Sequence, residues 1–205
     1  MNDVWAIVLA AGRSTRMGTQ KLLLPFGEKT IVECVVENIL NSGITKVVVV
    51  LGANCAEIEE VLKLWPIKTV RNENFQDGMH TSVISGVKTL PLNAKAVLIF
   101  LGDQPFISGT VVQNVVEAWK NSGKGIIIPL NKGKRGHPPL FDMKFRHELS
   151  NLDPEIGLRS VAQKFPKDIC EVETFCAEIV RDIDTKIDYI NELNKIKENG
   201  RNYSV

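Results

Sequence analysis

The sequence predicts an α/β protein with a three-layer α/β/α architecture, built on a doubly wound and mostly parallel sheet. Continuous runs of β-branched residues alternate along the chain with segments of helical apolar spacing. Strands that are apolar on both faces are typical of a parallel sheet covered by helices on either side. Because crossovers between parallel strands are right-handed, the helices are expected to divide between the two faces of the sheet.

The predicted elements follow one another regularly until about residue 130. Five apolar runs are predicted as strands, at residues 4–10, 46–51, 67–71, 96–101 and 125–130. Helices are predicted at residues 30–40, 55–64, 79–88 and 108–121. Beyond them we expect an exposed loop or hairpin at 131–139, a late strand at 179–183 and a charged final helix at 185–197. The 205 residues fit one domain, spanning 1–205.

Composition excludes several classes of protein. The net charge of +1 lacks the basic excess on which a nucleic-acid-binding protein depends. The apolar runs are far shorter than the roughly 20 residues of a membrane-spanning helix, and the first residues do not resemble a signal peptide. The four cysteines form no CxxC pair, which disfavours structural zinc. We therefore expect a reduced, cytoplasmic protein with no nucleic-acid or membrane partner.

The loop after the first predicted strand carries two glycines, Gly12 and Gly18, and the cations Arg13, Arg16 and Lys21. Ligands of open α/β sheets bind beyond the carboxyl ends of the strands, and small residues with nearby cations suit a phosphate-binding loop. The spacing fits neither a Walker A loop nor the Gly-x-Gly-x-x-Gly fingerprint, which disfavours P-loop kinases and nicotinamide dehydrogenases. The alternative is a tight surface turn whose cations are merely solvated.

Polar segments follow the other predicted strands as well. Asp103 ends the fourth strand within the segment Gly-Asp-Gln-Pro, and Asp182 and Asp184 follow the late strand. Mg²⁺ binds few carboxylates together with phosphate oxygens, so Asp103 is a candidate ligand opposite the glycine loop. The alternative for Asp103 is an ordinary turn at the start of a helix. Together, the strand ends carry the groups that bind a polyanion and a metal.

From residue 10 to residue 18 the chain reads Ala-Ala-Gly-Arg-Ser-Thr-Arg-Met-Gly, and Lys21 follows. This pattern resembles the signature of the MobA-like nucleotidyltransferases that make molybdenum cofactor dinucleotides, and within them the cytidylyltransferase branch. The resemblance implies the nucleotide-diphospho-sugar transferase fold. It implies that the backbone of Ala10, Ala11 and Gly12 contacts the base, whereas the triphosphate faces Arg13, Arg16 and Lys21, of which Arg16 and Lys21 are catalytic. The guanylyltransferase relatives usually have glycine in place of Ala11, whose methyl group would crowd a purine.

Further motifs extend the resemblance from residue 4 to about residue 189. Asp103 matches the family's Gly-Asp-x-Pro, and Asp184 matches the last carboxylate of a late Asp-x-Asp-Thr segment that shares the metal. The segment continues with Lys186 where the family usually has proline, and the alternative for Asp184 is that it caps the final helix. Gly78 and Ser82 match a segment that lines the nucleotide, with helix capping as the alternative.

The cationic, glycine-rich segment 132–139 suits an anionic acceptor that bears a terminal phosphate. Its Gly-His-Pro recurs in the cytidylyltransferase branch near the pterin, so Arg135 and His137 are predicted to bind the acceptor. Arg159, in a Gly-Leu-Arg-Ser segment that resembles a family helix near the acceptor, is added to this set. The alternatives are a solvated loop and a nucleic-acid patch, and the near-zero net charge disfavours the patch.

These features predict a Mg²⁺-dependent nucleotidyltransferase that releases pyrophosphate. The resemblance implies that CMP is transferred from CTP to the terminal phosphate of molybdopterin. The acceptor phosphate attacks the α-phosphorus in line, without a covalent enzyme intermediate. The partners implied are CTP, a molybdopterin-type acceptor and a molybdenum hydroxylase as client. The alternatives are a guanylyl- or sugar-1-phosphate nucleotidyltransferase, and a non-catalytic carrier of cofactor to such a hydroxylase.

Overall fold

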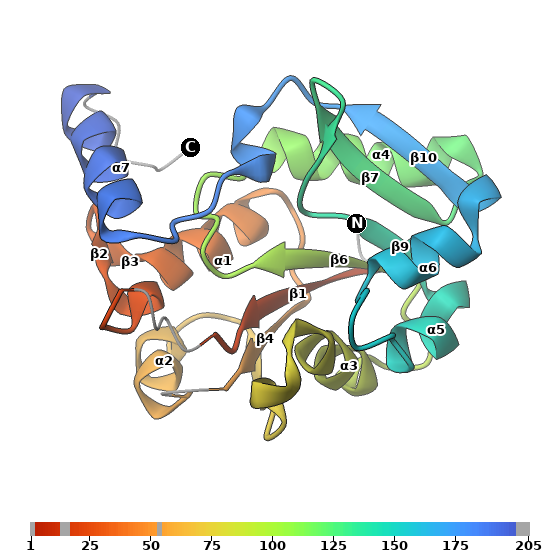
Figure 1. The fold of residues 1–205 in the computed structure, drawn as a ribbon, viewed down its shortest axis with the longest axis horizontal. Coiled ribbons are helices and arrows are strands. Elements are labelled where there is room, and N and C mark those ends of the chain that lie inside the picture. Colours follow the sequence, from red (N-terminus) through yellow and green to blue (C-terminus); the bar gives the residue numbers. More distant parts are fainter. Residues whose placement is uncertain (1–2, 13–16, 53–54, 200–205) are drawn as a thin grey trace.

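A large sheet runs through the molecule (Figure 1). The computed structural model describes residues 3–12, 17–52 and 55–199, with side chains described as far as Lys195. The strand order is β10-β7-β9-β6-β1-β4-β5. These strands are β1 (Val4–Ala10), β4 (Val47–Leu51), β5 (Lys68–Arg71), β6 (Ala96–Leu101), β7 (Ile126–Asn131), β9 (Leu140–Asp142) and β10 (Ile169–Glu173). The short β8 (Lys134–Arg135) pairs with β7, and β2 (Pro25–Phe26) pairs with β3 (Lys29–Thr30) in a separate ribbon.

Most strand pairs in the large sheet are parallel, as predicted. β1 is parallel to both β4 and β6, β4 is parallel to β5, and β7 is parallel to β10. Only β8 and β9 run against their neighbours in the described sheet, and β9 lies between β6 and β7. The five strands predicted before residue 131 are confirmed with ends that agree within one residue.

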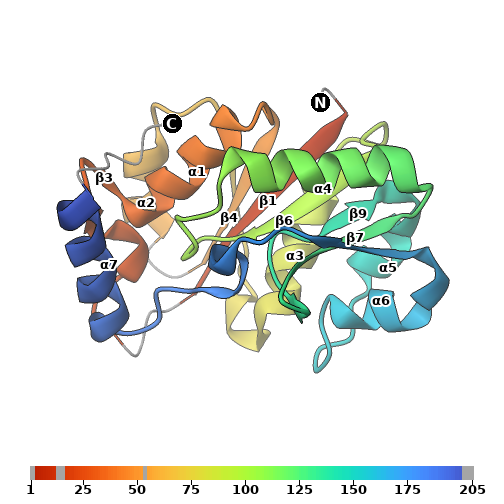
Figure 2. The ribbon, with the colours of Figure 1, turned by 90° about the horizontal axis from the view of Figure 1, so that it is seen from above.

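Helices cover both faces of the sheet (Figure 2). One apolar core contains residues of α1 (Ile31–Asn41), α2 (Cys55–Leu62) and α4 (Gly109–Ser122), and the other contains residues of α3 (Met79–Thr89), α5 (Arg146–Ser150) and α6 (Arg159–Lys164). Successive side chains of a strand point to opposite faces, so Ala6 and Val8 enter the first core, whereas Ile7 enters the second. The final helix α7 (Lys186–Asn199) lies beside the β2–β3 ribbon, where the Tyr189 hydroxyl donates to the Pro25 carbonyl at 2.6 Å.

The late strand predicted at 179–183 is wrong. The chain there forms a short 3₁₀ helix, η5 (Ala177–Val180), followed by irregular backbone. Ile179 and Ile183 are apolar because both are buried in the first core, and not because they pair in the sheet. The strand of this region is β10, which the sequence did not predict.

Within the described ranges, none of the helices is both long and apolar enough to cross a bilayer.

Candidate active site

The carboxyl ends of β1 and β6 lie side by side. The Gly102 amide donates to the Leu9 carbonyl at 3.0 Å. A Cβ on Gly102 would lie only 3.0 Å from that oxygen and 3.4 Å from the Cα of Ala10, so any larger residue would push the two segments apart by a few tenths of an ångström. Ala11 is buried, whereas Gly12 is exposed and would have no neighbour within 4 Å of an added Cβ. The exposed Gly12 therefore comes two residues after Ala10, which lies beside Gly102, the residue before Asp103.

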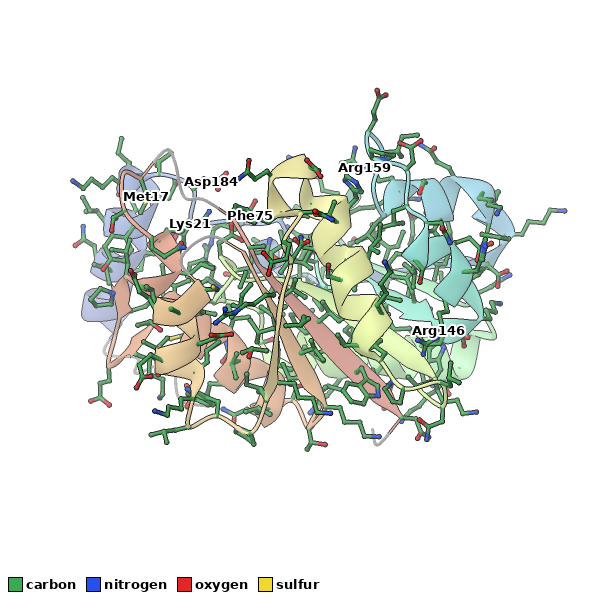
Figure 3. All side chains as sticks on the ribbon, turned by 90° about the horizontal axis from the view of Figure 1, so that it is seen from below. Met17, Lys21, Phe75, Arg146, Arg159 and Asp184 are labelled. Carbon is green, nitrogen blue, oxygen red and sulfur yellow. The ribbon has the colours of Figure 1, made fainter. Side chains whose placement is uncertain are left out.

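Lys21 joins the two carboxylates that were predicted to bind metal. It begins the 3₁₀ helix η1 (Lys21–Leu23), and its Nζ lies 2.7 Å from Asp103 Oδ2 and 2.9 Å from Asp184 Oδ1. Figure 3 shows Lys21 and Asp184 close together at one edge of the molecule. Partial burial acts to lower the pKa of Lys21, but the charges of the two aspartates and their hydrogen bonds outweigh it. The pKa of Lys21 is therefore raised, and its ammonium group is charged at neutral pH.

The donor set of this cluster fits Mg²⁺. One carboxylate oxygen of Asp103 and one of Asp184 lie within hydrogen-bonding distance of the same ammonium nitrogen, so both are close enough to hold one cation. No group of three or more His, Cys, Asp or Glu side chains in the described ranges is arranged to hold a metal. Two carboxylates, completed by phosphate oxygens and water, are what Mg²⁺ commonly binds in enzymes that act on nucleotides.

A backbone contact brings Asp184 to Asp103. The amide of buried Ile183 donates to the Asp103 carbonyl at 3.1 Å. The first turn of α7 is capped by Thr185, whose Oγ1 accepts from the Asp188 amide at 3.2 Å, while Asp188 Oδ2 accepts from the Thr185 amide at 2.8 Å. This is a reciprocal capping box. Thr185 therefore occupies the N-cap, and the carboxylate of Asp184 points to Lys21 instead.

Gln104 and Asp182 form a second polar pair, which the sequence did not predict. The Gln104 side chain is buried, and its Nε2 donates to Asp182 Oδ1 at 2.5 Å. Loss of hydration, and then the charges of Asp103 and Asp184, raise the pKa of Asp182, whereas the hydrogen bond from Gln104 acts in the opposite direction. Both residues stand in motifs that the sequence displays, but only the fold reveals that they meet.

Of the residues predicted to line the nucleotide, Gly78 and Ser82 lie at the start of α3. Gly78 is the exposed N-cap and has a φ of 115°, a conformation that favours glycine. Ser82 is 3% exposed, and its Oγ accepts from Asn72 Nδ2 at 3.0 Å. The same amide donates to Thr81 Oγ1 at 2.8 Å. This network ties the Ser82 hydroxyl to Asn72, in the segment before α3, and the N-cap of α3 is Gly78, so the Ser82 hydroxyl does not cap the helix.

Three chain segments converge on Ala11. Gly52 directly follows β4, and a Cβ there would lie 2.7 Å from the Ala11 carbonyl oxygen and 2.7 Å from Cγ of Phe75. Phe75 begins the 3₁₀ helix η2 (Phe75–Asp77) and lies at the same edge of the molecule as Lys21 (Figure 3). The aromatic ring therefore packs against the strand ends beside the backbone predicted to contact the base. The sequence reading missed this contact.

His137 is half-buried near the carboxylate cluster. Its amide donates to the Ile179 carbonyl at 2.8 Å, and its Nδ1 lies 3.2 Å from the Ile99 carbonyl oxygen. Burial lowers the pKa of His137, and the contact with Ile99 and the charges of Asp182 and Asp103 oppose this only in part. The imidazole is therefore neutral at pH 7. Because a carbonyl oxygen only accepts hydrogen bonds, Nδ1 carries the proton and Nε2 is left as an acceptor.

The predicted arginines are more widely spread. Arg135, in β8, forms an ion pair with Glu171 of β10, with Nη2 2.6 Å from Oε1, and both side chains are exposed. Arg159 is the exposed first residue of α6 and lies toward the same edge of the molecule as Phe75 and Asp184 (Figure 3). Arg13 and Arg16 lie outside the described residues.

Comparison with known proteins places the chain among enzymes that act on nucleotides. Residues 6–169 match the family described as "MobA-like NTP transferase domain". The chain belongs to this family. The molybdenum cofactor cytidylyltransferase of Escherichia coli (strain K12) is 27% identical over 199 residues, which cover 97% of this chain and 100% of that protein. The nicotine blue oxidoreductase of Paenarthrobacter nicotinovorans is 28% identical over 189 residues, covering 89% of this chain and 92% of that protein.

The fold of this MobA-like NTP transferase recurs in solved structures. A nucleotidyl transferase from Methanothermobacter thermautotroptrophicus matches it with a TM-score of 0.81 at 25% identity, covering 97% of this chain and 100% of that chain. The predicted family, fold class and enzyme class, a nucleotidyltransferase, are thereby confirmed. The two curated relatives bear the names of different reactions at nearly equal identity, so the substrates must be argued from the residues of the site.

Proposed function

We propose that this MobA-like NTP transferase transfers CMP from CTP to the terminal phosphate of a molybdopterin-type acceptor in the presence of Mg²⁺ and releases pyrophosphate. The observation that carries the proposal is the meeting of Lys21, Asp103 and Asp184 at the carboxyl ends of β1 and β6. An ammonium group and a pair of carboxylates suit a reaction between two phosphates that depends on a divalent cation. The E. coli relative, by its name, supports the choice of nucleotide and acceptor.

The proposed reaction needs alignment and neutralisation of charge more than it needs a base. The exposed backbone at Gly12 and the buried Ala11 would contact the cytosine, and the Ala11 methyl group would crowd a purine. Lys21 would neutralise the triphosphate. Asp103 and Asp184 would hold Mg²⁺, which when bound supplies positive charge to the phosphate oxygens. An ionised oxygen of the acceptor phosphate forms the new bond to the α-phosphorus as the bond to pyrophosphate breaks, and no proton has to be removed.

The acceptor is proposed to lie against His137. A neutral imidazole with Nε2 as its acceptor suits an N–H donor of a pterin ring, and it adds no positive charge for a phosphate. Arg159 is proposed to meet the acceptor from α6. Arg135 would have to leave Glu171 in order to do so.

Pyrophosphate release tests the proposal. We would measure it with Mg²⁺ and molybdopterin, comparing CTP, GTP, ATP and UTP. We expect release with CTP, and a loss greater than tenfold in Asp103→Asn, which keeps the shape of the side chain but removes its charge. Asp168→Asn is the matched control, because Asp168 pairs with Lys144, outside the proposed site, and should leave activity unchanged.

Each alternative predicts a different outcome. A preference for GTP would move the chain to the guanylyltransferases and contradict the role given to Ala11. Binding of nucleotide without pyrophosphate release from any of the four would favour another acceptor, or the carrier for a molybdenum hydroxylase. A loss in Asp103→Asn of less than tenfold, about 1.4 kcal/mol in the barrier, would contradict the role given to Asp103.

A further inference from the structure

The ammonium group of Lys21 lies where a cation shared by Asp103 and Asp184 must bind. It contacts Oδ2 of one aspartate at 2.7 Å and Oδ1 of the other at 2.9 Å. The Lys21 side chain is only 13% exposed, so these ion pairs are partly shielded from water. Charges interact more strongly when they are shielded from water in this way. The contacts thus hold together two carboxylates that would otherwise repel each other.

We propose that Lys21 is a built-in counter-ion that competes with the divalent cation for Asp103 and Asp184. The inference rests on the proposed function, since it takes these two aspartates as the metal ligands. A divalent ion and an ammonium group repel each other at contact distance, so they cannot occupy the same pair of oxygens together. Lys21 must leave the carboxylates before the metal binds them.

The chemistry of lysine suits such an exchange. Its ammonium is a compact charge on a flexible four-carbon stem, so it can turn from the carboxylates to the phosphates of a nucleotide without movement of the backbone. When the metal binds the two carboxylates, Lys21 becomes free to contact the phosphates. Conversely, when the phosphates attract Lys21, the two carboxylates become free to bind the metal. By thermodynamic linkage, each ligand then favours the other, and the metal alone binds weakly.

Binding of Mn²⁺ to the full chain without nucleotide tests the inference, followed by the electron paramagnetic resonance signal of the free ion. Lys21→Met and Lys21→Gln should both bind Mn²⁺ roughly tenfold more tightly than the wild-type chain, because two competing ion pairs have been removed. Lys21→Arg keeps the charge and should bind as weakly as wild type. The matched control is Lys29→Met, which removes a lysine paired with Glu37 at 3.0 Å elsewhere in the molecule and should change nothing.

A double variant locates the effect. Lys21→Met combined with Asp103→Asn should bind Mn²⁺ no more tightly than Asp103→Asn alone, because the gain requires the carboxylate that Lys21 covers. Equal or weaker Mn²⁺ binding in both folded neutral variants than in wild type would overturn the inference. So would an equal gain in Lys29→Met.

The assay also separates this inference from the proposed function. Pyrophosphate release by the wild-type chain, without any gain of Mn²⁺ affinity in the neutral variants, would overturn the counter-ion role and leave the transferase activity standing. A gain of Mn²⁺ affinity in the neutral variants, together with no pyrophosphate release by the wild-type chain, would support the counter-ion role and contradict the proposed reaction.

Discussion

Replacing Gly52 by alanine is expected to destabilise the protein by straining the strand ends at the candidate site. The added Cβ would lie 2.7 Å from the Ala11 carbonyl oxygen, and 2.7 and 2.8 Å from Cγ and Cβ of Phe75. Phe75 meets the added methyl group with Cγ and Cβ, the atoms nearest its backbone, and Ala11 directly follows β1, which is paired on both sides with β4 and β6. The close contact between the added Cβ and the Ala11 oxygen can therefore be relieved only if the backbone at the strand ends moves. Such overpacking costs about 1–3 kcal/mol of unfolding free energy.

Urea unfolding followed by circular dichroism measures this cost. Gly12→Ala is the matched control, because its Cβ would have no neighbour within 4 Å, and the unfolding free energy should stay within about 0.5 kcal/mol of wild type. A Phe75→Ala background removes the Cγ contact but keeps those with the Ala11 oxygen and with Cβ of residue 75, so Gly52→Ala should cost less there yet remain destabilising, and the double-mutant cycle reports the difference. An unchanged unfolding free energy in Gly52→Ala would refute the reasoning, since it would mean that the strand ends have room for a methyl group.

Two further predictions follow from burial. Because burial lowers the pKa of His137 from its ordinary value of 6.5, the unfolded chain takes up a proton below that pH that the folded protein resists. Stability should therefore fall as the pH is lowered through 6.5, by at most about 1.4 kcal/mol per pH unit, and His137→Asn should show a shallower decline in urea unfolding. Burial raises the pKa of the Cys34 thiol to about 12, so iodoacetamide should label Cys34 only in the unfolded protein. Labelling of Cys34 in the native protein, detected by peptide mass spectrometry, would contradict the second prediction.

The central part of the fold was predictable because its sequence signals agree with one another. The strands β1, β4, β6 and β7 are almost wholly buried, so their apolar runs leave little choice of structure. Helix starts were marked by chemistry as well: Thr30 and Glu33 form a capping box, and the Ser108 side chain accepts from the Val111 amide.

The edge of the sheet was harder to predict. In β10, the exposed Glu171 and Glu173 alternate with less exposed residues, so the strand lacks the continuous apolar run by which the other strands were found. Without β10, no sequence argument could pair Arg135 with Glu171, so the ion pair that Arg135 would have to leave could not be predicted. The buried Ile179 and Ile183 suggested a strand because burial alone gives the same apolar spacing.

Only the part of the site that lies at the ends of the parallel strands could be predicted from the sequence. Lys21 and Asp103 follow strands that the sequence identifies, so their proximity could be expected. Asp184 reaches them through the bond from the Ile183 amide to the Asp103 carbonyl, made by an irregular segment whose path no periodicity describes. The contacts of Gln104 and Phe75 depend likewise on how separate segments pack, which residue type alone does not reveal.

The charges at the candidate site also explain why a nucleotide would need a cation to bind there. Asp103, Asp182 and Asp184 place three carboxylates close together, and their mutual repulsion contributes to the raised pKa of Asp182. Lys21 neutralises part of this charge, and the neutral His137 adds none. A triphosphate that drew Lys21 away would leave the carboxylates without that compensation, at a cost in Coulomb energy that grows as the site closes to water. Metal and nucleotide are therefore expected to enter together, since each removes the charge that opposes the other.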